Sequence, residues 1–304
     1  MTLPTFPKFK HISKKDLLNI TELTRRHPPY SDYDFISLFI WDTNKSILIS
    51  SLFDNLVIQF SDYVSGEPFL SFLGTNKTVE TINILLTHSK NKGFGTKLRL
   101  IPEVVVSSIN LAEIEGKLKI VEDINNRDYI LDVEKIANMS GKKLHQKRKL
   151  IKRFTETYEY SVGVMPLKNA TLRKKLLAFF FQWEKERGKS RSETKNELTA
   201  FRRMLSFWRH YSGEVLVVYL KNKIFGFTIF EQIDKDYAIS AFQKGLLSMR
   251  GIYEVLNWEV AKYLKSKGVK YINIEQDLGI LGLRRSKQDY NPTYFNKYIV
   301  KNAE

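Results

Sequence analysis

The sequence predicts an α+β (α/β) protein that contains two successive copies of one unit of strands and helix. Three observations predict this fold: each half has a hairpin pattern, each hairpin is followed by a strand, a helix and a strand, and the two helices end in similar residues. The chain has 304 residues, of which 43% are hydrophobic, so it can bury one or two full cores. We therefore expect two mixed, twisted sheets flanked by helices.

The carboxyl half gives the clearer pattern. Apolar and β-branched runs at 214–220 and 224–230, separated by a polar turn, predict a hairpin. A third strand is expected at 237–242, and apolar residues at helical spacing predict a helix over 252–265. A strand at 270–275 then leads into a loop.

The amino half repeats this order after about 170 residues. A hairpin over 46–60 and a strand at 68–73 precede a helix over 78–90 and a strand at 97–101. Ser-Lys-Asn-Lys-Gly at 89–93 matches Leu-Lys-Ser-Lys-Gly at 264–268. The alternative is that any α+β protein contains hairpins and helices. We divide the chain into domains at 1–135 and 136–304, of which the second opens with a basic helix near 141–158.

This basic helix carries a dense group of cations. Seven of the twelve residues from Lys142 to Arg153 are Lys or Arg, in a chain of net charge +16. On a helix, apolar residues form one stripe and cations the opposite face. The stripe is Leu144, Ile151, Phe154 and Tyr158, and the opposite face is Lys142, Lys149, Lys152 and Arg153. Such a face fits a polyanion or an anionic membrane surface, or it is simply a solvated helix face.

Composition excludes several chemistries. The absence of cysteine removes disulfides, thiolate metal sites and cysteine nucleophiles, and the five His do not form a metal-binding spacing, so we expect no metal. Phosphate-binding glycine loops and serine nucleophile elbows are also missing. No run is apolar over the length of a signal peptide or a membrane span, so we expect a cytoplasmic protein. The aromatic residues of 172–186 could stack on bases, but their spacing favours core.

The loop after the last strand of the second copy is the strongest candidate for chemistry. It brings acidic, glycine and basic residues together in sequence, namely Glu275, Asp277, Gly279, Gly282, Arg284, Arg285 and Lys287. The carboxylates could hold or deprotonate an amine, while the cations could hold a phosphate or an oxyanion. The same residues could equally form a salt-bridged turn.

Three parts of the sequence resemble a known family. They are residues 275–292 with Lys297 and Tyr298, the basic segment 141–154, and residues 31–35 with Trp41. These are bacterial proteins related to the carboxy-terminal domain of phosphatidylglycerol lysyltransferase, and the resemblance covers most of the chain. It implies two tandem GNAT-like acyltransferase domains, similar to the Fem-type enzymes that use aminoacyl-tRNA. In such folds two neighbouring strands separate, and the acceptor attacks a donor held between them without a covalent enzyme intermediate.

The resemblance implies roles for individual residues. Asp277 and Glu275 would be catalytic by orienting or deprotonating the nucleophile. The expected substrate-binding residues are Arg284, Lys287, Gly279, Gly282, Arg250 and Glu197. The expected nucleic-acid-binding residues are Lys147, Arg148 and Lys152.

The resemblance also implies partners. Aminoacyl-tRNA is the favoured donor, because residues 243–251 do not match the Gln/Arg-x-x-Gly-x-Gly/Ala loop of GNAT enzymes that use coenzyme A. The acceptor would be an amine or hydroxyl of a lipid or small molecule, and a peripheral contact with an anionic membrane is compatible. The alternatives are a non-catalytic module that binds RNA or anionic lipid, and an N-acyltransferase that depends on acyl-coenzyme A.

Overall fold

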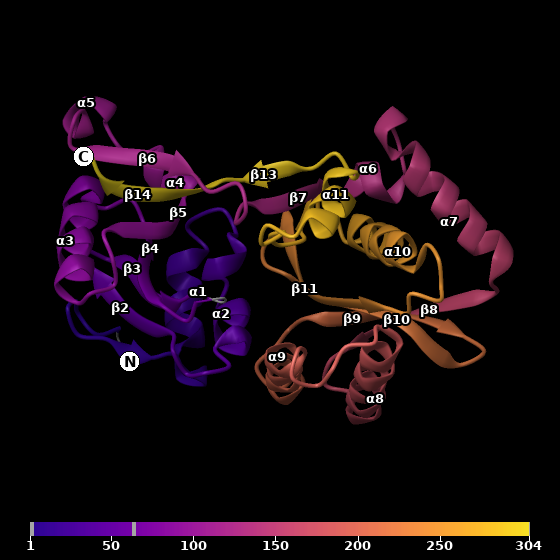
Figure 1. The fold of residues 1–304 in the computed structure, drawn as a ribbon. Helices are drawn as coiled ribbons and strands as arrows, with labels where there is room; N and C mark the ends of the chain where they lie inside the picture. The colour runs from indigo at the N-terminus through magenta and orange to yellow at the C-terminus, as the bar shows by residue number, and fades with distance from the viewer. Residues whose placement is uncertain (1–2, 63–64, 304) are drawn as a thin grey trace. The chain divides into compact units, whose positions relative to one another are not determined.

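The computed structural model describes residues 3–62 and 65–303, and the chain forms two compact units (Figure 1). Unit 1 comprises Met1–Asp128, Gln276–Gly279 and Tyr294–Glu304, and unit 2 comprises Tyr129–Glu275 and Ile280–Thr293. Both units contain sheets flanked by helices, which confirms the predicted fold class. Among the described residues, none of the helices combines the length and the apolar character that crossing a bilayer requires.

Unit 1 contains two antiparallel sheets. The first has the order β1-β2-β3-β4 and the second has the order β5-β14-β6. Its strands are β1 (Lys10–His11), β2 (Leu48–Leu52), β3 (Asn55–Ser61), β4 (Pro68–Leu73), β5 (Lys97–Pro102), β6 (Leu118–Glu122) and β14 (Lys297–Asn302). Its helices are η1 (Lys14–Asp16), α1 (Leu17–Thr24), η2 (Ser31–Tyr33), α2 (Phe35–Trp41), α3 (Thr78–Asn91), α4 (Glu103–Val106) and α5 (Leu111–Ile114).

The last strand explains why the units differ from the predicted division at residue 135. β14 pairs with both β5 and β6, so the end of the chain belongs to unit 1 and not to the second domain. Val300 of β14 is fully buried and contributes to the same core as Leu98 of β5 and Leu85 of α3. A local sequence pattern cannot reveal this pairing, because the partners lie about 200 residues apart.

A buried ion cluster ties distant segments of unit 1 together. The Lys297 ammonium, which is fully buried, donates to Asp128 at 2.8 Å and also to Asp32. Asp128 in turn accepts the Ser31 backbone N–H at 2.8 Å and the Ser31 hydroxyl at 2.7 Å. Burial alone would lower the pKa of Lys297, but the two carboxylates outweigh it and raise that pKa.

Unit 2 contains a larger mixed sheet. The strand order within it is β7-β12-β11-β10-β9-β8, in which only β11 and β12 pair in parallel. Its strands are β8 (Tyr160–Pro166), β9 (Glu214–Leu220), β10 (Lys223–Gln232), β11 (Tyr237–Gly245) and β12 (Tyr271–Asn273), while β7 (Asp128–Asp132) and β13 (Thr293–Phe295) lie where the chain passes between the units. Its helices are α6 (Val133–Ala137), η3 (Lys142–Leu144), α7 (His145–Thr157), α8 (Ala170–Glu186), α9 (Lys195–Ser206), α10 (Ile252–Ser266) and α11 (Leu281–Gln288).

Helices cover both faces of this sheet. Figure 1 shows α10 on one face of β9 and β10, and α8 and α9 on the other. Phe180 of α8 stacks on Phe201 of α9 with 5.2 Å between ring centroids, and Phe201 stacks on Phe227 of β10 at 5.6 Å. This confirms that the aromatic residues of α8 form core, as their spacing predicted.

Two paired glycines bring α10 close to the sheet. Gly226 of β10 and Gly245 of β11 face each other in register. A Cβ atom at Gly245 would lie 2.8 Å from Ile252 Cγ2, which is closer than van der Waals contact allows. The glycines therefore let the first turn of α10 rest directly on the end of β11.

The two units repeat one order of elements, as the sequence predicted. The order β2-β3-β4-α3-β5 in unit 1 corresponds to β9-β10-β11-α10-β12 in unit 2. Leu100 and Glu275 both have positive φ, 56° and 59°, and they are separated by the same interval as Gly93 and Gly268. An uncommon backbone conformation at equivalent positions supports a duplication.

We expect Lys297→Met to destabilise unit 1 strongly, because it would leave the carboxylates of Asp128 and Asp32 without their ammonium. Breaking a buried ion pair in this way costs about 3–5 kcal/mol. Calorimetric melting against Lys119→Met, which removes an exposed lysine of β6, measures the effect. Equal melting temperatures for the two variants would show that the cluster contributes nothing to stability.

The cluster also predicts a pH dependence. Because the folded pKa of Lys297 lies above the ordinary value of 10.5, its stabilisation is fully present below that pH and is lost as the pH rises through the folded pKa. The difference in melting temperature between wild type and Lys297→Met should therefore be constant from about pH 7 to pH 9 and shrink above about pH 10.5. A difference that shrinks already below pH 9 would contradict the raised pKa.

Candidate active site

The parallel strands of unit 2 separate part-way along their length. Tyr237–Ile239 of β11 pair with Tyr271–Asn273 of β12. β11 then continues to Gly245, whereas β12 ends at Asn273. We call this separation the fork, with residues 240–245 on one side and 274–275 on the other.

The sequence bends the chain away at the end of β12. The Asn273 side chain, which is fully buried, accepts the backbone N–H of Glu275 at 2.8 Å. Glu275 itself has a φ of 59°, an uncommon conformation that ends the regular strand, although Ile274 and Glu275 remain hydrogen-bonded to Tyr129 of β7. An Asn side chain that binds the backbone two residues on is a common turn device.

A chain of side-chain hydrogen bonds lies beside the fork. Gln243 of β11 donates both amide hydrogens, one to Thr228 Oγ1 at 3.0 Å and one to Asn257 Oδ1 at 2.8 Å. Asn257 of α10 donates to the hydroxyl of Tyr290 at 3.0 Å. Because both hydrogens are engaged, Gln243 offers its amide oxygen as an acceptor. Burial raises the pKa of Tyr290, so its hydroxyl stays protonated at neutral pH.

Lys287 lies on the other side of the fork. Its ammonium donates to the carbonyl oxygens of Ile274 at 2.5 Å and Glu275 at 3.2 Å, and it lies 5.6 Å from the ring centroid of Tyr129. The predicted cation is therefore present at the end of β12, where two carbonyl groups orient it. An oriented ammonium can stabilise an oxyanion.

The remaining loop residues occupy different surroundings. Asp277 belongs to unit 1, is fully buried, and accepts the backbone N–H of Gly279 at 2.7 Å. Glu275 belongs to unit 2 and is half-buried. Gly282 is exposed and Arg284 is half-buried, both in α11. Asp277 thus takes part in a backbone turn, and its role in chemistry stays a prediction.

Glu197 forms an internal ion pair. It accepts from the ammonium of Lys244, which is 8% exposed and lies 4.2 Å from the ring centroid of Trp183. Burial lowers the pKa of Lys244, and Glu197 opposes that effect. Substrate binding by Glu197 would have to compete with this pair. Arg250 is exposed in the loop before α10.

The loop between β11 and α10 binds a carboxylate from another helix of the same chain. Glu186, the last residue of α8, accepts the backbone N–H groups of Leu247 at 2.9 Å and Ser248 at 2.8 Å. Burial acts to raise the pKa of Glu186, but the hydrogen bonds from Ser248 and Leu247 outweigh it and lower the pKa. Backbone amides ahead of a helix are a site for anions, and Glu186 takes that position here.

The basic helix α7 has the two faces that the sequence predicted. Leu144, Ile151 and Phe154 are buried, and the predicted basic face is exposed. Two of the predicted nucleic-acid-binding residues, however, have internal partners. Lys147 is 5% exposed and pairs with Glu254 at 3.0 Å, and Arg148 donates to two backbone carbonyls, those of Met139 and Gly141.

Lys152 does lie on the exposed face of α7. Its side chain is 76% exposed, and Glu156 lies 3.6 Å away at the next turn. Lys149 and Arg153 of the same helix and Lys142 of η3 are exposed as well, so these cations with Lys152 are accessible to a polyanion.

In unit 1, a tyrosine lies at the position that corresponds to the fork of unit 2. The hydroxyl of Tyr33, which is 1% exposed, donates to the carbonyl of Phe72 in β4 at 3.0 Å and lies 3.2 Å from that of Leu100 in β5. It also lies 2.5 Å from the Ser71 hydroxyl. β4 and β5 belong to separate sheets, so Tyr33 occupies the place where these two strands diverge.

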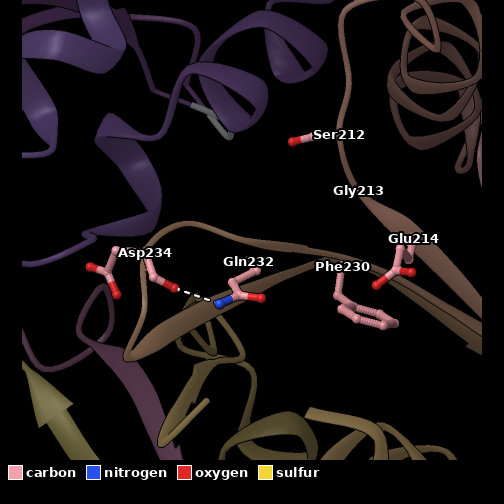
Figure 2. Close-up of a pocket in the computed structure, with 6 residues that line it drawn as sticks. All are labelled: Ser212, Gly213, Glu214, Phe230, Gln232 and Asp234. Carbon is pink, nitrogen blue, oxygen red and sulfur yellow. Dashed lines mark hydrogen bonds between the residues drawn. The ribbon is translucent and has the colours of Figure 1, made fainter. Parts of the chain in front are cut away.

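A separate cavity lies at the other end of β10, where the strand approaches the turn to β11 (Figure 2). It has a volume of about 330 Å³ and is lined by Ser212, Gly213, Glu214, Phe230, Gln232 and Asp234. Glu214 accepts from the Tyr263 hydroxyl at 2.6 Å, and burial together with Glu214 raises the pKa of Tyr263 to about 12. None of the predicted site residues lines this cavity.

Within residues 3–62 and 65–303, no group of three or more His, Asp or Glu side chains is placed to hold a metal ion.

A family model described as the carboxy-terminal domain of phosphatidylglycerol lysyltransferase matches residues 31–301. The chain belongs to this family. A comparison with curated proteins finds no match.

Three solved structures share the fold. A conserved protein of unknown function from Bacteroides thetaiotaomicron has a TM-score of 0.82 and 24% identity, over 97% of this chain and 99% of that one. L-PGS from Bacillus licheniformis has a TM-score of 0.64 and 14% identity, over 97% and 93% of the two chains. FemX has a TM-score of 0.56 and 8% identity, over 96% of each chain. The chain therefore has the fold that L-PGS and FemX share, the Fem-type likeness that the sequence resemblance implied.

Sequence reasoning missed several residues of the fork. Gln243 and Asn257 carried no distinct signal, since the strand and the helix that hold them also contain other polar and charged residues. The hydrogen-bond partners of Tyr290 and Glu186 were not predicted, because these partners lie far away along the chain.

Asp277 can be tested by two substitutions that differ in one respect. Asp277→Asn keeps an oxygen that accepts the Gly279 N–H, whereas Asp277→Ala removes it. We expect the Ala variant to lose about 1–3 kcal/mol of stability and the Asn variant to melt close to wild type. Melting temperatures measured together with transfer rates decide the role. An Asn variant that melts normally but transfers nothing would instead assign proton transfer to Asp277.

Proposed function

We propose that this chain is an acyltransferase that moves an aminoacyl group from aminoacyl-tRNA to an amine or hydroxyl acceptor at the fork of unit 2. The observation that carries this proposal is the fork itself, with an available amide oxygen of Gln243 on one side and the oriented ammonium of Lys287 on the other. Membership of a lysyltransferase-related family supports acyl transfer as the reaction class.

The proposed chemistry is direct transfer. The acceptor nitrogen or oxygen attacks the ester carbonyl of the donor, a bond from the acceptor to the carbonyl carbon forms, and the bond to the ribose oxygen breaks. The acceptor proton leaves to solvent or to the departing ribose oxygen. Gln243 would orient the N–H or O–H of the acceptor, and Lys287 would stabilise the oxyanion.

Unit 1 has a supporting role in this proposal. Tyr33 fills the divergence of β4 and β5 and satisfies backbone carbonyls there, so a donor would have to displace a buried side chain. We therefore assign the reaction to unit 2 alone.

The choice of donor rests on Glu186. Its carboxylate accepts two amides of the loop before α10, the groups that would otherwise bind a pyrophosphate. A second anion there would be repelled by Glu186. This supports aminoacyl-tRNA over acyl-coenzyme A as the donor, and the exposed cations of α7 supply a surface for its phosphates.

The proposed function is tested with a pool of radiolabelled aminoacyl-tRNAs and an extract of lipids and small amines. We expect wild type to move label into an acid-stable product free of RNA. Gln243→Ala should transfer about 100-fold more slowly, because the acceptor loses its orienting group. The control is Gln232→Ala, which changes an exposed glutamine of the same sheet.

Two outcomes would contradict the proposal. Salt-sensitive tRNA binding with no label transfer would indicate a binding module, and equal rates for the two glutamine variants would place the reaction elsewhere than the fork.

We expect Glu186→Ala to allow the loop between β11 and α10 to bind coenzyme A. Wild type should show no thermal shift with coenzyme A, whereas the variant should be stabilised, because two backbone amides become available to a phosphate. Glu193→Ala is the matched control, since Glu193 also accepts a backbone N–H, that of Ser190 at 2.8 Å, in another loop. Stabilisation of wild type by coenzyme A would favour the acyl-coenzyme A alternative.

A further inference from the structure

The side-chain amide of Gln243 has two sides of opposite polarity, and only one of them suits an acceptor that carries a hydrogen. The amide oxygen accepts hydrogen bonds, whereas the NH2 group donates them. In the structure the NH2 group binds Thr228 Oγ1 at 3.0 Å and Asn257 Oδ1 at 2.8 Å, so the oxygen is the side that a ligand can use. A half-turn of the amide would exchange the two sides and present donors in place of the acceptor.

Asn257 of α10 couples this orientation to a second amide. Gln243 donates to Asn257 Oδ1, and Asn257 Nδ2 donates to the hydroxyl of Tyr290 at 3.0 Å. A half-turn of only one of the two amides would set oxygen against oxygen or NH2 against NH2, and no hydrogen bond would join them. Because the buried Tyr290 hydroxyl accepts from Asn257, the oxygen of Asn257 stays directed at Gln243.

The other partner of Gln243 does not decide its orientation. Thr228 is fully buried, and its hydroxyl can both donate and accept, so it can bind the amide of Gln243 in either orientation. Asn257 lacks this freedom while Tyr290 accepts its NH2 group. The polarity that Gln243 presents at the fork therefore depends on residues one and two hydrogen bonds away.

We infer that Asn257 and Tyr290 are positioning residues, which fix the amide of Gln243 with its oxygen towards the fork. Neither residue has to touch the donor or the acceptor, since each acts through the next hydrogen bond. The inference rests on the proposed function and deepens it, because it adds how the acceptor is selected. A group with an N–H or O–H hydrogen is oriented by Gln243, and a group without one is not.

Two substitutions of Asn257 test this inference in the transfer assay. Asn257→Asp has two oxygens and no NH2 group, so Gln243 must still donate to it, whereas Asn257→Leu keeps a similar volume and removes both groups. We expect kcat of the Asp variant to stay within about threefold of wild type and kcat of the Leu variant to fall roughly tenfold. The KM for aminoacyl-tRNA should stay unchanged in both variants.

Melting temperatures separate positioning from a purely structural role. Asn257→Asp places a charge at a half-buried site and should melt below wild type, yet it should transfer like wild type. A kcat that falls together with the melting temperature of the Asp variant would overturn the inference. A Leu variant that transfers as fast as wild type would overturn it as well.

Tyr290→Phe tests the second position. It should slow transfer roughly fivefold in the natural chain, because Asn257 loses the group that holds its NH2 side. It should leave the rate of Asn257→Asp unchanged, since a carboxylate directs an oxygen at Gln243 without help. Tyr263→Phe is the matched control, because it removes a buried hydrogen bond to Glu214 at the other end of α10. Equal slowing by Tyr290→Phe in both backgrounds would contradict the role of Tyr290.

A measurement without turnover distinguishes failure of this inference from failure of the proposed function. In the full chain labelled with 15N-glutamine, the Gln243 NH2 signal is identified by its loss in Gln243→Ala. These hydrogens should exchange with water about tenfold more slowly than those of the exposed Gln232, and Asn257→Leu should remove the protection. Exchange as fast as that of Gln232 in the natural chain would overturn the inference. A protected amide without label transfer would instead overturn the proposed function and leave the orientation of Gln243 established.

Discussion

The separation of β11 from β12 is the constraint on which the rest of unit 2 depends. Two parallel strands that part leave backbone groups without a ladder partner, and such groups must bind something else. Lys287 binds the carbonyls of Ile274 and Glu275, and Asn273 binds the amide of Glu275. Side chains that bind these unpaired backbone groups thus lie where a reaction could use them. A site of this kind arises from the sheet topology and needs no metal-binding or nucleophile motif.

The two copies bind the backbone groups at their separating strands in different ways. In unit 1 a single hydroxyl, that of Tyr33, lies between the carbonyls of Phe72 and Leu100. This contact is uncharged and buried, so it stabilises the unit but leaves the Tyr33 hydroxyl inaccessible to a ligand. In unit 2 the corresponding position has an ammonium and a polar chain that includes the half-buried Gln243. In the proposed function, the closed copy has a structural role and the open copy is the one to which we assign the reaction.

The sequence predicted the elements well because they depend on local patterns. The hairpins, α3, α10 and the two faces of α7 follow from periodicity and turn residues. The return of β14 to unit 1 and the partners of Lys147 and Glu197 were not predicted, since each joins residues far apart along the chain. At the loop after β12, residue types alone could not distinguish a salt-bridged turn from a catalytic group. Burial of Asp277 and exposure of Ile280 and Leu281 are properties of the folded chain.

The positive charge of the chain divides into two kinds of cation. Lys147, Lys244 and Lys297 are buried against carboxylates, where they fix geometry and are closed to solvent. Exposed cations such as Lys152 and Arg285 act over a Debye length of about 8 Å at physiological ionic strength, enough to attract a polyanion or a lipid surface. Glu186 places a negative charge at one loop, where it accepts the backbone N–H groups of Leu247 and Ser248. The positions of the charges in the folded chain therefore determine which anions can bind. The net charge of +16 only attracts anions in general.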